Sequence, residues 1–362
     1  MKTTASPLAR PGTGRWRAGL GRAVLAGLAV AAVAPPAPAG GQARAAANSG
    51  PDRGLSRLEA EIGRLAELAG GVVGVGAIHL ETGRSVHLNP HERFPTASTR
   101  KLPIAVELMD QVDRGVLRLD SLIHLAPEDM HPGSGVINNL LDDPGVALSL
   151  RNLMDLMMQV SDGAATSVVL EAIGGPQVVS AKMQKLGLEE IYLGRNTLEI
   201  LAAFYGVDQL PEPGPGFLAR FNAKAAAVPA ARRLAAEEAY YKDRRESTTP
   251  AAMADLLARL WRGELLSPGS TRLLLGVMYG CQSSPNRLKA LLPPGTPVAR
   301  KDGTIGMVTN DVGIIDLPDG AGHVVAAVFV KDSSLPVPDR ERAIAMIARA
   351  LYDYFLFPGV SI

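Results

Sequence analysis

A serine and a lysine three positions apart are the first candidates for chemistry in this chain. Ser98 and Lys101 lie in the segment Phe94–Pro103, at the start of a predicted helix. Residues three apart on a helix share a face, and an amine there can take the proton of a hydroxyl that is a poor nucleophile alone. A helix start also offers free N–H groups and partial positive charge to an oxyanion. The spacing predicts Ser98 as nucleophile and Lys101 as base, although an N-capping serine beside a solvated lysine has the same pattern.

Two later segments add polar side chains of the kind that such a serine needs. Ser161-Asp162-Gly163 stands between two predicted helices, where it could be only a helix cap. Lys301-Asp302-Gly303-Thr304 lies on or just past a predicted strand, where alone it would be an edge-strand turn. The two follow Ser98 by 63 and 203 residues (161−98 and 301−98). The ordered set Ser-x-x-Lys, Ser-Asp-x and Lys-x-Gly is far more specific than any member.

Other kinds of site are disfavoured by composition and spacing. No two histidines have helical metal-ligand spacing, because Pro90 separates His87 from His91, so we expect no metal and no cofactor. There is no Gly-x-Ser-x-Gly elbow and no dinucleotide-binding loop. Cys281 is the only cysteine, which excludes an internal disulfide, and we interpret it as a small buried apolar side chain. The net charge of +1 argues against nucleic-acid partners, and we expect a monomer.

The elements that must position these residues come from both ends of the chain. Residues 55–66 have helical periodicity, and Val72–Leu80 with Arg84–Leu88 form a predicted hairpin. Strands return late in the chain, and a helical block of about residues 102–287 separates them from the hairpin. The pattern predicts an α/β fold, with a largely antiparallel five-stranded sheet flanked by helices and an inserted all-helical subdomain. The predicted elements of the late region are Val298–Lys301, Val312–Leu317, His323–Val330 and a closing helix, Arg340–Tyr354.

The first 47 residues have the layout of a secretory signal peptide. Basic residues precede an apolar run, Ala23–Ala34, which small residues follow. The run is 12 residues long, whereas a membrane-spanning helix needs about 20. We therefore expect residues 1–47 to be removed, residues 48–362 to form the mature domain, and the product to be secreted or periplasmic without stable membrane insertion.

At these motifs the sequence resembles the class A β-lactamases and their serine-hydrolase relatives. The likeness includes Pro132-Gly133-Ser134-Gly135 and Ser247-Thr248-Thr249-Pro250, and it covers about residues 55–360. It implies that Ser98 forms an acyl-enzyme, that Lys101 deprotonates it, and that Ser161 protonates the leaving group. It further implies that Lys301 supplies positive charge and that the N–H groups of Ser98 and Thr304 form an oxyanion hole. Gly163, Asp302, Gly303 and Thr304 are the implied substrate-binding residues.

Three departures from the family pattern concern the substrate. Gly163 replaces the asparagine of the family's Ser-Asp-Asn motif. The resulting Ser-Asp-Gly form also resembles the β-lactamase-like esterase of the clavulanic acid pathway. Asp302 replaces the middle residue of the family's Lys-Thr-Gly motif, whose hydroxyl binds the substrate carboxylate. The carboxylate of Asp302 would repel a substrate carboxylate at that point. The deacylating glutamate of the family falls at Thr197, which leaves Glu199, two positions away, as a possible deacylation base.

These departures leave four functions open. We expect a serine hydrolase that acts on esters or amides, a class of substrates that includes β-lactams. The alternatives are a true β-lactamase, a penicillin-binding carboxypeptidase or slowly deacylating β-lactam-binding protein, and a non-catalytic envelope module.

Overall fold

A computed structural model describes residues 52–130, 132–141 and 145–357. The predicted signal peptide, residues 1–47, lies outside the described residues. Within these ranges no helix has the length and apolar character needed to cross a bilayer. The described residues form one compact unit, and the domain boundary expected near residue 48 stays a prediction.

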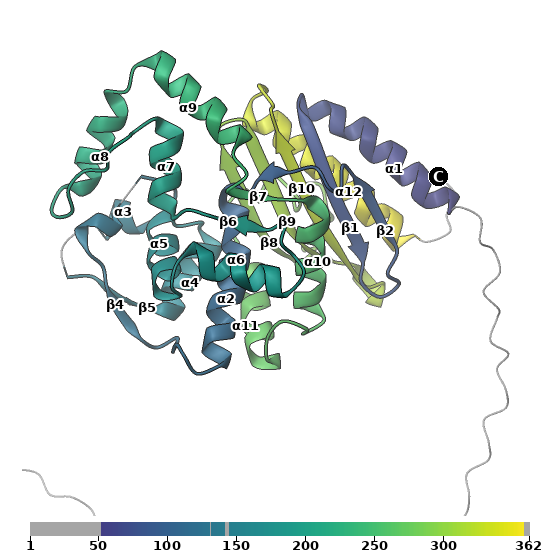
Figure 1. Cartoon of the computed structure of the whole chain (residues 1–362). Coiled ribbons are helices and arrows are strands. Elements are labelled where there is room, and N and C mark those ends of the chain that lie inside the picture. Colours follow the sequence, from purple (N-terminus) through teal and green to yellow (C-terminus); the bar gives the residue numbers. More distant parts are fainter. Residues whose placement is uncertain (1–51, 131, 142–144, 358–362) are drawn as a thin grey trace, which may run out of the picture. The chain divides into compact units, whose positions relative to one another are not determined.

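The main sheet has the five antiparallel strands that the sequence predicts, in the order β2-β1-β10-β9-β8 (Figure 1). The hairpin β1–β2 comes from the start of the described chain and the other three strands from its end, so the helical block lies between them in sequence. The strands are β1 (Val72–His79), β2 (Ser85–Leu88), β8 (Val298–Ile305), β9 (Val308–Asp316) and β10 (His323–Lys331).

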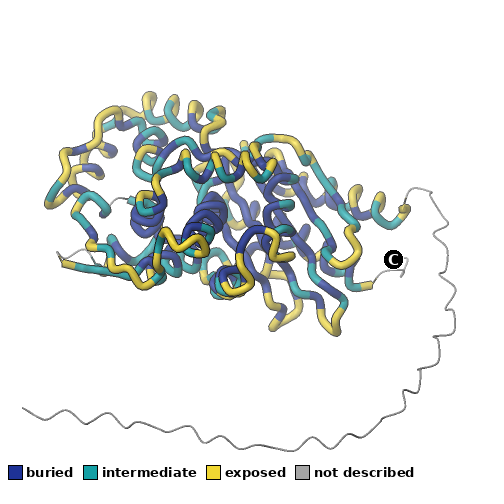
Figure 2. Tube along the Cα trace, turned by 60° about the horizontal axis from the view of Figure 1, so that its bottom comes forward, coloured by how far each residue is buried: buried dark blue, intermediate teal, exposed yellow. Residues whose placement is uncertain are grey.

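Both faces of this sheet are covered by helices, which explains why its central strand is apolar almost throughout. Successive side chains of a strand point to opposite faces. Val324 and Val328 of β10 pack with α1 (Arg53–Ala66) and α12 (Val337–Leu356). Val325 and Ala327 join the larger core on the other face, which includes α10 (Pro250–Trp261) and α11 (Pro268–Tyr279). Figure 2 shows this interior as buried trace.

The helical block and its short strands pack beside the second face. Its core includes buried side chains of α2, α4 and α5, among them Leu108, Met157 and Val169. The remaining elements are α2 (Lys101–Asp113), α3 (Ile137–Leu140), α4 (Leu150–Gln159), α5 (Gly163–Ala172), α6 (Pro176–Lys185), α7 (Thr197–Tyr205), α8 (Phe217–Ala226), α9 (Ala230–Lys242), β3 (Phe94–Pro95), β4 (Leu122–His124), β5 (Ala147–Ser149), β6 (Tyr192–Leu193) and β7 (Glu246–Thr248).

One expectation about local structure needs correction, and one segment is defined more closely. The segment 207–231, which is rich in proline, glycine and alanine, contains all of α8 and the start of α9. Between Pro229 and Asp243, only Tyr240 of α9 is fully buried, so this helix lies on the surface and its sequence has little apolar periodicity. Strand β9 also begins at Val308 rather than Val312, because the polar run Thr309-Asn310-Asp311 is itself buried in the sheet.

Candidate active site

Ser98 lies in a tight 3-10 turn, residues Ala97–Arg100, between β3 and α2. Ala97 has φ of 46°, a left-handed conformation that is costly for a residue with a Cβ. The amide of Asn310 in β9 holds the start of the turn by donating to the carbonyl oxygens of Pro95 and Thr96, at 2.9 and 3.1 Å. The turn presents Ser98 to a cavity of about 310 Å³.

Lys101, the first residue of α2, lines the same cavity but is only 3% exposed. Its Nζ donates to the carbonyl oxygen of Ser161 at 2.7 Å and lies 3.1 Å from Ser161 Oγ. Burial, reinforced by the positive charge of Lys301, holds the pKa of Lys101 well below its usual value. The amine is thereby shifted toward the neutral form, which can accept a proton.

Ser161 reaches this amine because the chain turns sharply between α4 and α5. Its φ of 58° is another left-handed conformation. Asp162 then caps α5, accepting from the N–H of Ala165 at 2.8 Å, while its other oxygen accepts from the N–H of Val136 at 2.7 Å. Ser134 completes the turn by donating to the carbonyl oxygen of Ser161 at 2.6 Å. The motif therefore has both predicted features, because Asp162 caps α5 and Ser161 contacts Lys101.

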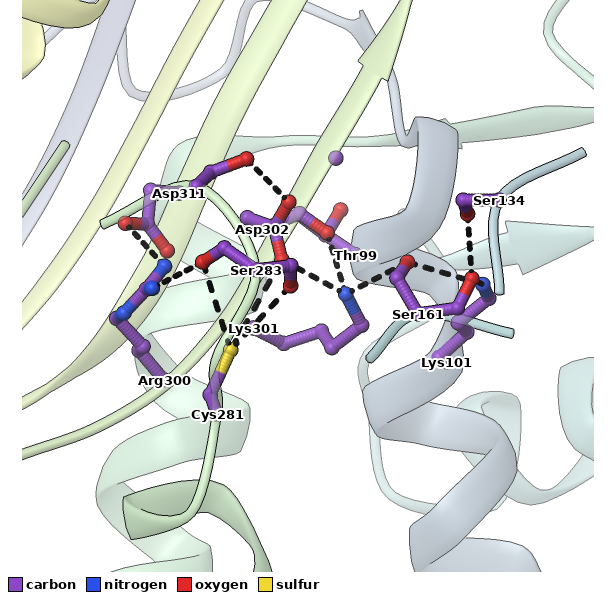
Figure 3. A network of polar contacts seen from close by, with 12 residues as sticks. Thr99, Lys101, Ser134, Ser161, Cys281, Ser283, Arg300, Lys301, Asp302 and Asp311 are labelled. Carbon is purple, nitrogen blue, oxygen red and sulfur yellow. Dashed lines mark hydrogen bonds and ion pairs between the residues drawn. The ribbon is translucent and has the colours of Figure 1, made fainter. Parts of the chain in front are cut away.

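Lys301, fully buried on β8, contacts the same hydroxyl as Lys101 (Figure 3). Its Nζ donates to Ser161 Oγ at 3.0 Å, to the carbonyl oxygen of Asp302 at 2.8 Å and to Asp302 Oδ1 at 3.0 Å. An ammonium group has three N–H donors, and all three are used. Lys301 therefore has a full set of hydrogen-bond acceptors and is ion-paired with Asp302, unlike Lys101.

Gly303 brings β8 against the turn that carries Ser98. A Cβ at Gly303 would lie 2.7 Å from the backbone nitrogen of Ser98 and 3.0 Å from the carbonyl oxygen of Thr96. Such contacts are too short for any side chain, so only glycine allows this approach. The next residue, Thr304, lines the cavity together with Ser98. Strand β8, about 200 residues later in the sequence, thus packs directly against the turn that carries Ser98.

The comparisons with known proteins agree with this arrangement. The family profile described as "Beta-lactamase enzyme family" matches residues 57–355. The chain belongs to the β-lactamase enzyme family. It is 28% identical over 308 residues to a β-lactamase of Bacteroides uniformis, covering 83% of this chain and 91% of the relative. It is 29% identical to the extended-spectrum β-lactamase PER-1 of Pseudomonas aeruginosa, covering 74% and 78%.

A solved structure of a β-lactamase from Chitinophaga pinensis has the same fold. It superposes with a TM-score of 0.68 at 28% identity, covering 82% of this chain and 98% of that one. The predicted resemblance and fold class are therefore confirmed, and the protein is a serine hydrolase of the β-lactamase family. The roles expected for individual residues rest on the geometry described above and stay proposals.

Asp302, at one of the family's substrate-binding positions, points away from the cavity. Its oxygens accept from Lys301 Nζ and from the hydroxyl of Ser283, and Ser284 Oγ donates to Oδ2 at 2.8 Å. Burial alone would raise the pKa of Asp302, but Lys301, Ser283 and Arg287 together hold it below its usual value. Asp302 is an ionised partner of Lys301, and it is absent from the described residues that line the cavity.

The segment around Thr197 and Glu199, where the resemblance predicts the deacylating base, forms the start of α7. Thr197 begins α7 and lines the cavity, as does Gly163. Glu199 is exposed and belongs to a capping box, in which it accepts from the N–H of Asn196 at 2.8 Å while Asn196 Oδ1 accepts from the N–H of Glu199. Glu199 does not line the cavity, so we assign it no part in the chemistry.

Sequence reasoning did not identify three residues at this site. Asn310 holds the nucleophile turn, and the signal for it was a polar run inside an apolar strand. Arg100, between Ser98 and Lys101, is buried and lines the cavity. Cys281, expected to be buried among apolar groups, is half-buried, with Sγ 3.6 Å from Ser283 Oγ and 3.9 Å from Asp302 Oδ1.

Proposed function

We propose that this member of the β-lactamase family is an exported hydrolase of esters or amides that acts through an acyl-enzyme on Ser98. The observation that carries the proposal is the single hydroxyl, Ser161 Oγ, that Lys101 and Lys301 both contact beside the nucleophile turn. Lys101 can act as the base for Ser98, and the hydroxyl that both lysines contact can carry a proton from Lys101 to the leaving group.

The first step is attack of Ser98 Oγ on the substrate carbonyl, with its proton passing to Lys101 Nζ. A neutral amine has two N–H donors and one lone pair. Donation to the two oxygens of Ser161 leaves the lone pair free for that proton. The N–H groups of Ser98 and Thr304 receive the oxyanion, in a site where buried donors are worth most.

The second step is departure of the leaving group, for which Ser161 supplies the proton. Its oxygen accepts from both lysines, so its own hydrogen is directed elsewhere, toward the leaving oxygen or nitrogen. The proton that Lys101 gained then returns to Ser161. Water next attacks the acyl group, with the neutral Lys101 as base, which regenerates Ser98.

Two features favour esters or amides other than ordinary penicillins. Asp302 neutralises Lys301, so the carboxylate of a penicillin loses an electrostatic partner. Thr197 cannot act as a base, because a hydroxyl takes up no proton near neutral pH. The named relatives are β-lactamases, which makes β-lactam hydrolysis the second candidate.

A turnover screen of the purified protein against nitrocefin, a penicillin and small aryl esters separates the two. Steady hydrolysis of the esters, with slow release from β-lactams, supports the proposal, whereas rapid steady hydrolysis of nitrocefin supports the second candidate. Lys101→Ala should lower the acylation rate by about 10²–10⁴-fold with every substrate. If the variant keeps most of its activity, Lys101 is not the base.

A further inference from the structure

Arg100 is a buried cation with unpartnered nitrogens at the cavity wall. It is 4% exposed, and one of its terminal nitrogens donates to the carbonyl oxygen of Arg195 at 2.6 Å. Its Nε and its other terminal nitrogen have no hydrogen-bond partner among the described residues. A buried charge with unpaired donors is costly, so a ligand that accepts hydrogen bonds from these nitrogens would be bound favourably.

The surroundings of Arg100 leave its charge available. Glu246 also lines the cavity, but its oxygens accept from the N–H of Gly194 at 3.2 Å and from the side chain of Arg195 at 2.7 Å. Arg195 also pairs with Asp243 at 3.4 Å, which Arg245 balances at 2.6 Å. These three arginines and two carboxylates, with Arg100 counted among the arginines, carry a net charge of +1 (3 − 2). Burial lowers the pKa of Arg100 to about 10, so the guanidinium is charged at neutral pH.

A further donor lies in the same wall. The hydroxyl of Thr197 is buried without a partner in the described part of the chain, and Thr197 lies two residues after Arg195, whose carbonyl Arg100 contacts. This wall is separate from Ser161, which supplies the leaving-group proton, because the adjacent side chains of Arg100 and Lys101 point in different directions. Lys101 points to Ser161, whereas Arg100 points to the segment before α7.

We propose that Arg100, with Thr197, binds a carboxylate on the acyl part of the substrate, so that the preferred substrates are esters or amides of acids with a second carboxylate. The inference rests on the proposed function, in which Ser161 serves the leaving group, and it adds that the acyl part lies toward Arg100. A carboxylate fits because it accepts several hydrogen bonds from a guanidinium.

The test compares 4-nitrophenyl hydrogen adipate with 4-nitrophenyl methyl adipate, which carry a carboxylate and its uncharged methyl ester at the far end. The unaltered protein should favour the acid in kcat/KM, after subtraction of the uncatalysed rate. Arg100→Gln should reduce that preference about 10- to 100-fold, the range expected for hydrogen bonds to a charged group. Arg232→Gln, on the exposed part of α9, is the matched control and should leave the preference unchanged.

Binding of free adipate to the Ser98→Ala protein, measured by calorimetry, keeps the inference testable if Arg100→Gln fails to fold. Adipate should bind with one-to-one stoichiometry and more tightly than its dimethyl ester. Equal turnover of both esters, no adipate binding, or equal binding of chloride and adipate would each overturn the carboxylate site. Absence of any acylation of Ser98 would instead overturn the proposed function.

Discussion

Lys101 and Lys301 contact the same hydroxyl oxygen, Ser161 Oγ, with Nζ–Oγ distances of 3.1 and 3.0 Å. The two amines differ in what else they touch. Lys301 is paired with the carboxylate of Asp302, whereas the partners of Lys101 are the two uncharged oxygens of Ser161. One lysine is thus ion-paired, whereas burial lowers the pKa of the other.

This difference predicts how the pH dependence of acylation responds to substitution. Lys101 accepts a proton only when neutral, so kcat/KM should rise with pH through its pKa in the free enzyme. Lys301→Gln removes a like charge, which raises the pKa of Lys101 and moves the rise to higher pH. Asp302→Asn removes an opposite charge and should move it to lower pH. Kinetic pH profiles with a neutral ester test this, and shifts in the same direction would contradict it.

Asp302 should also control which substrates bind. Because it neutralises Lys301, Asp302→Thr should restore a net positive charge and lower KM for carboxylated β-lactams relative to neutral esters. Steady-state kinetics with one substrate of each type measures the ratio. If both KM values change equally, Asp302 acts only on the fold, through its bonds to Ser283 and Ser284.

Deacylation should be slow for β-lactams. Thr197 supplies no base, and a β-lactam keeps its leaving nitrogen tethered in the site, whereas an ester loses its alcohol and opens a path for water. We expect burst kinetics with a stable β-lactam adduct on Ser98, and smoother turnover of small esters. Glu199→Gln should change neither, because glutamine fills the same capping position. A preserved burst with a large loss of steady rate in this variant would restore Glu199 as the base.

The close approach of Gly303 to Ser98 should be required for catalysis. In Gly303→Ala, the new Cβ must push β8 away from the backbone nitrogen of Ser98. Loss of one oxyanion donor costs about 10²–10³-fold in kcat, and we expect a fall of that size. Gly276→Ala in α11 is the control, since a Cβ there meets nothing within 4 Å. Activity and Tm of both variants test this, and full activity in Gly303→Ala would refute it.

Much of this organisation could be predicted from local sequence patterns. The hairpin β1–β2, the helices α4, α5 and α10, and the antiparallel sheet follow from apolar periodicity and turns. The motifs at Ser98, Ser161 and Lys301 could be recognised because each has a fixed spacing. The three motifs come together in space because of the order of the strands in the sheet, and no single segment of the sequence predicts that order.

The residues that escaped prediction depend on tertiary contacts. Arg100 and Asn310 are polar, so the sequence suggests solvent, yet both are buried by elements distant in the chain. Helix α9 lies inside the predicted helical block, but its bounds could not be predicted because its exposed faces show no apolar stripe. The orientation of Asp302 was open for a similar reason, since it is set by Ser283 and Ser284 rather than by its own strand.

The most direct measurement of the central claim is intact-mass analysis after treatment with a fluorophosphonate or a penicillin. The unaltered protein should gain one adduct per chain, and peptide mapping should place it on Ser98. Ser98→Ala should fold with the same Tm, gain no adduct and lose several orders of magnitude in turnover. An adduct on another residue, or turnover that survives in Ser98→Ala, would contradict the acyl-enzyme account.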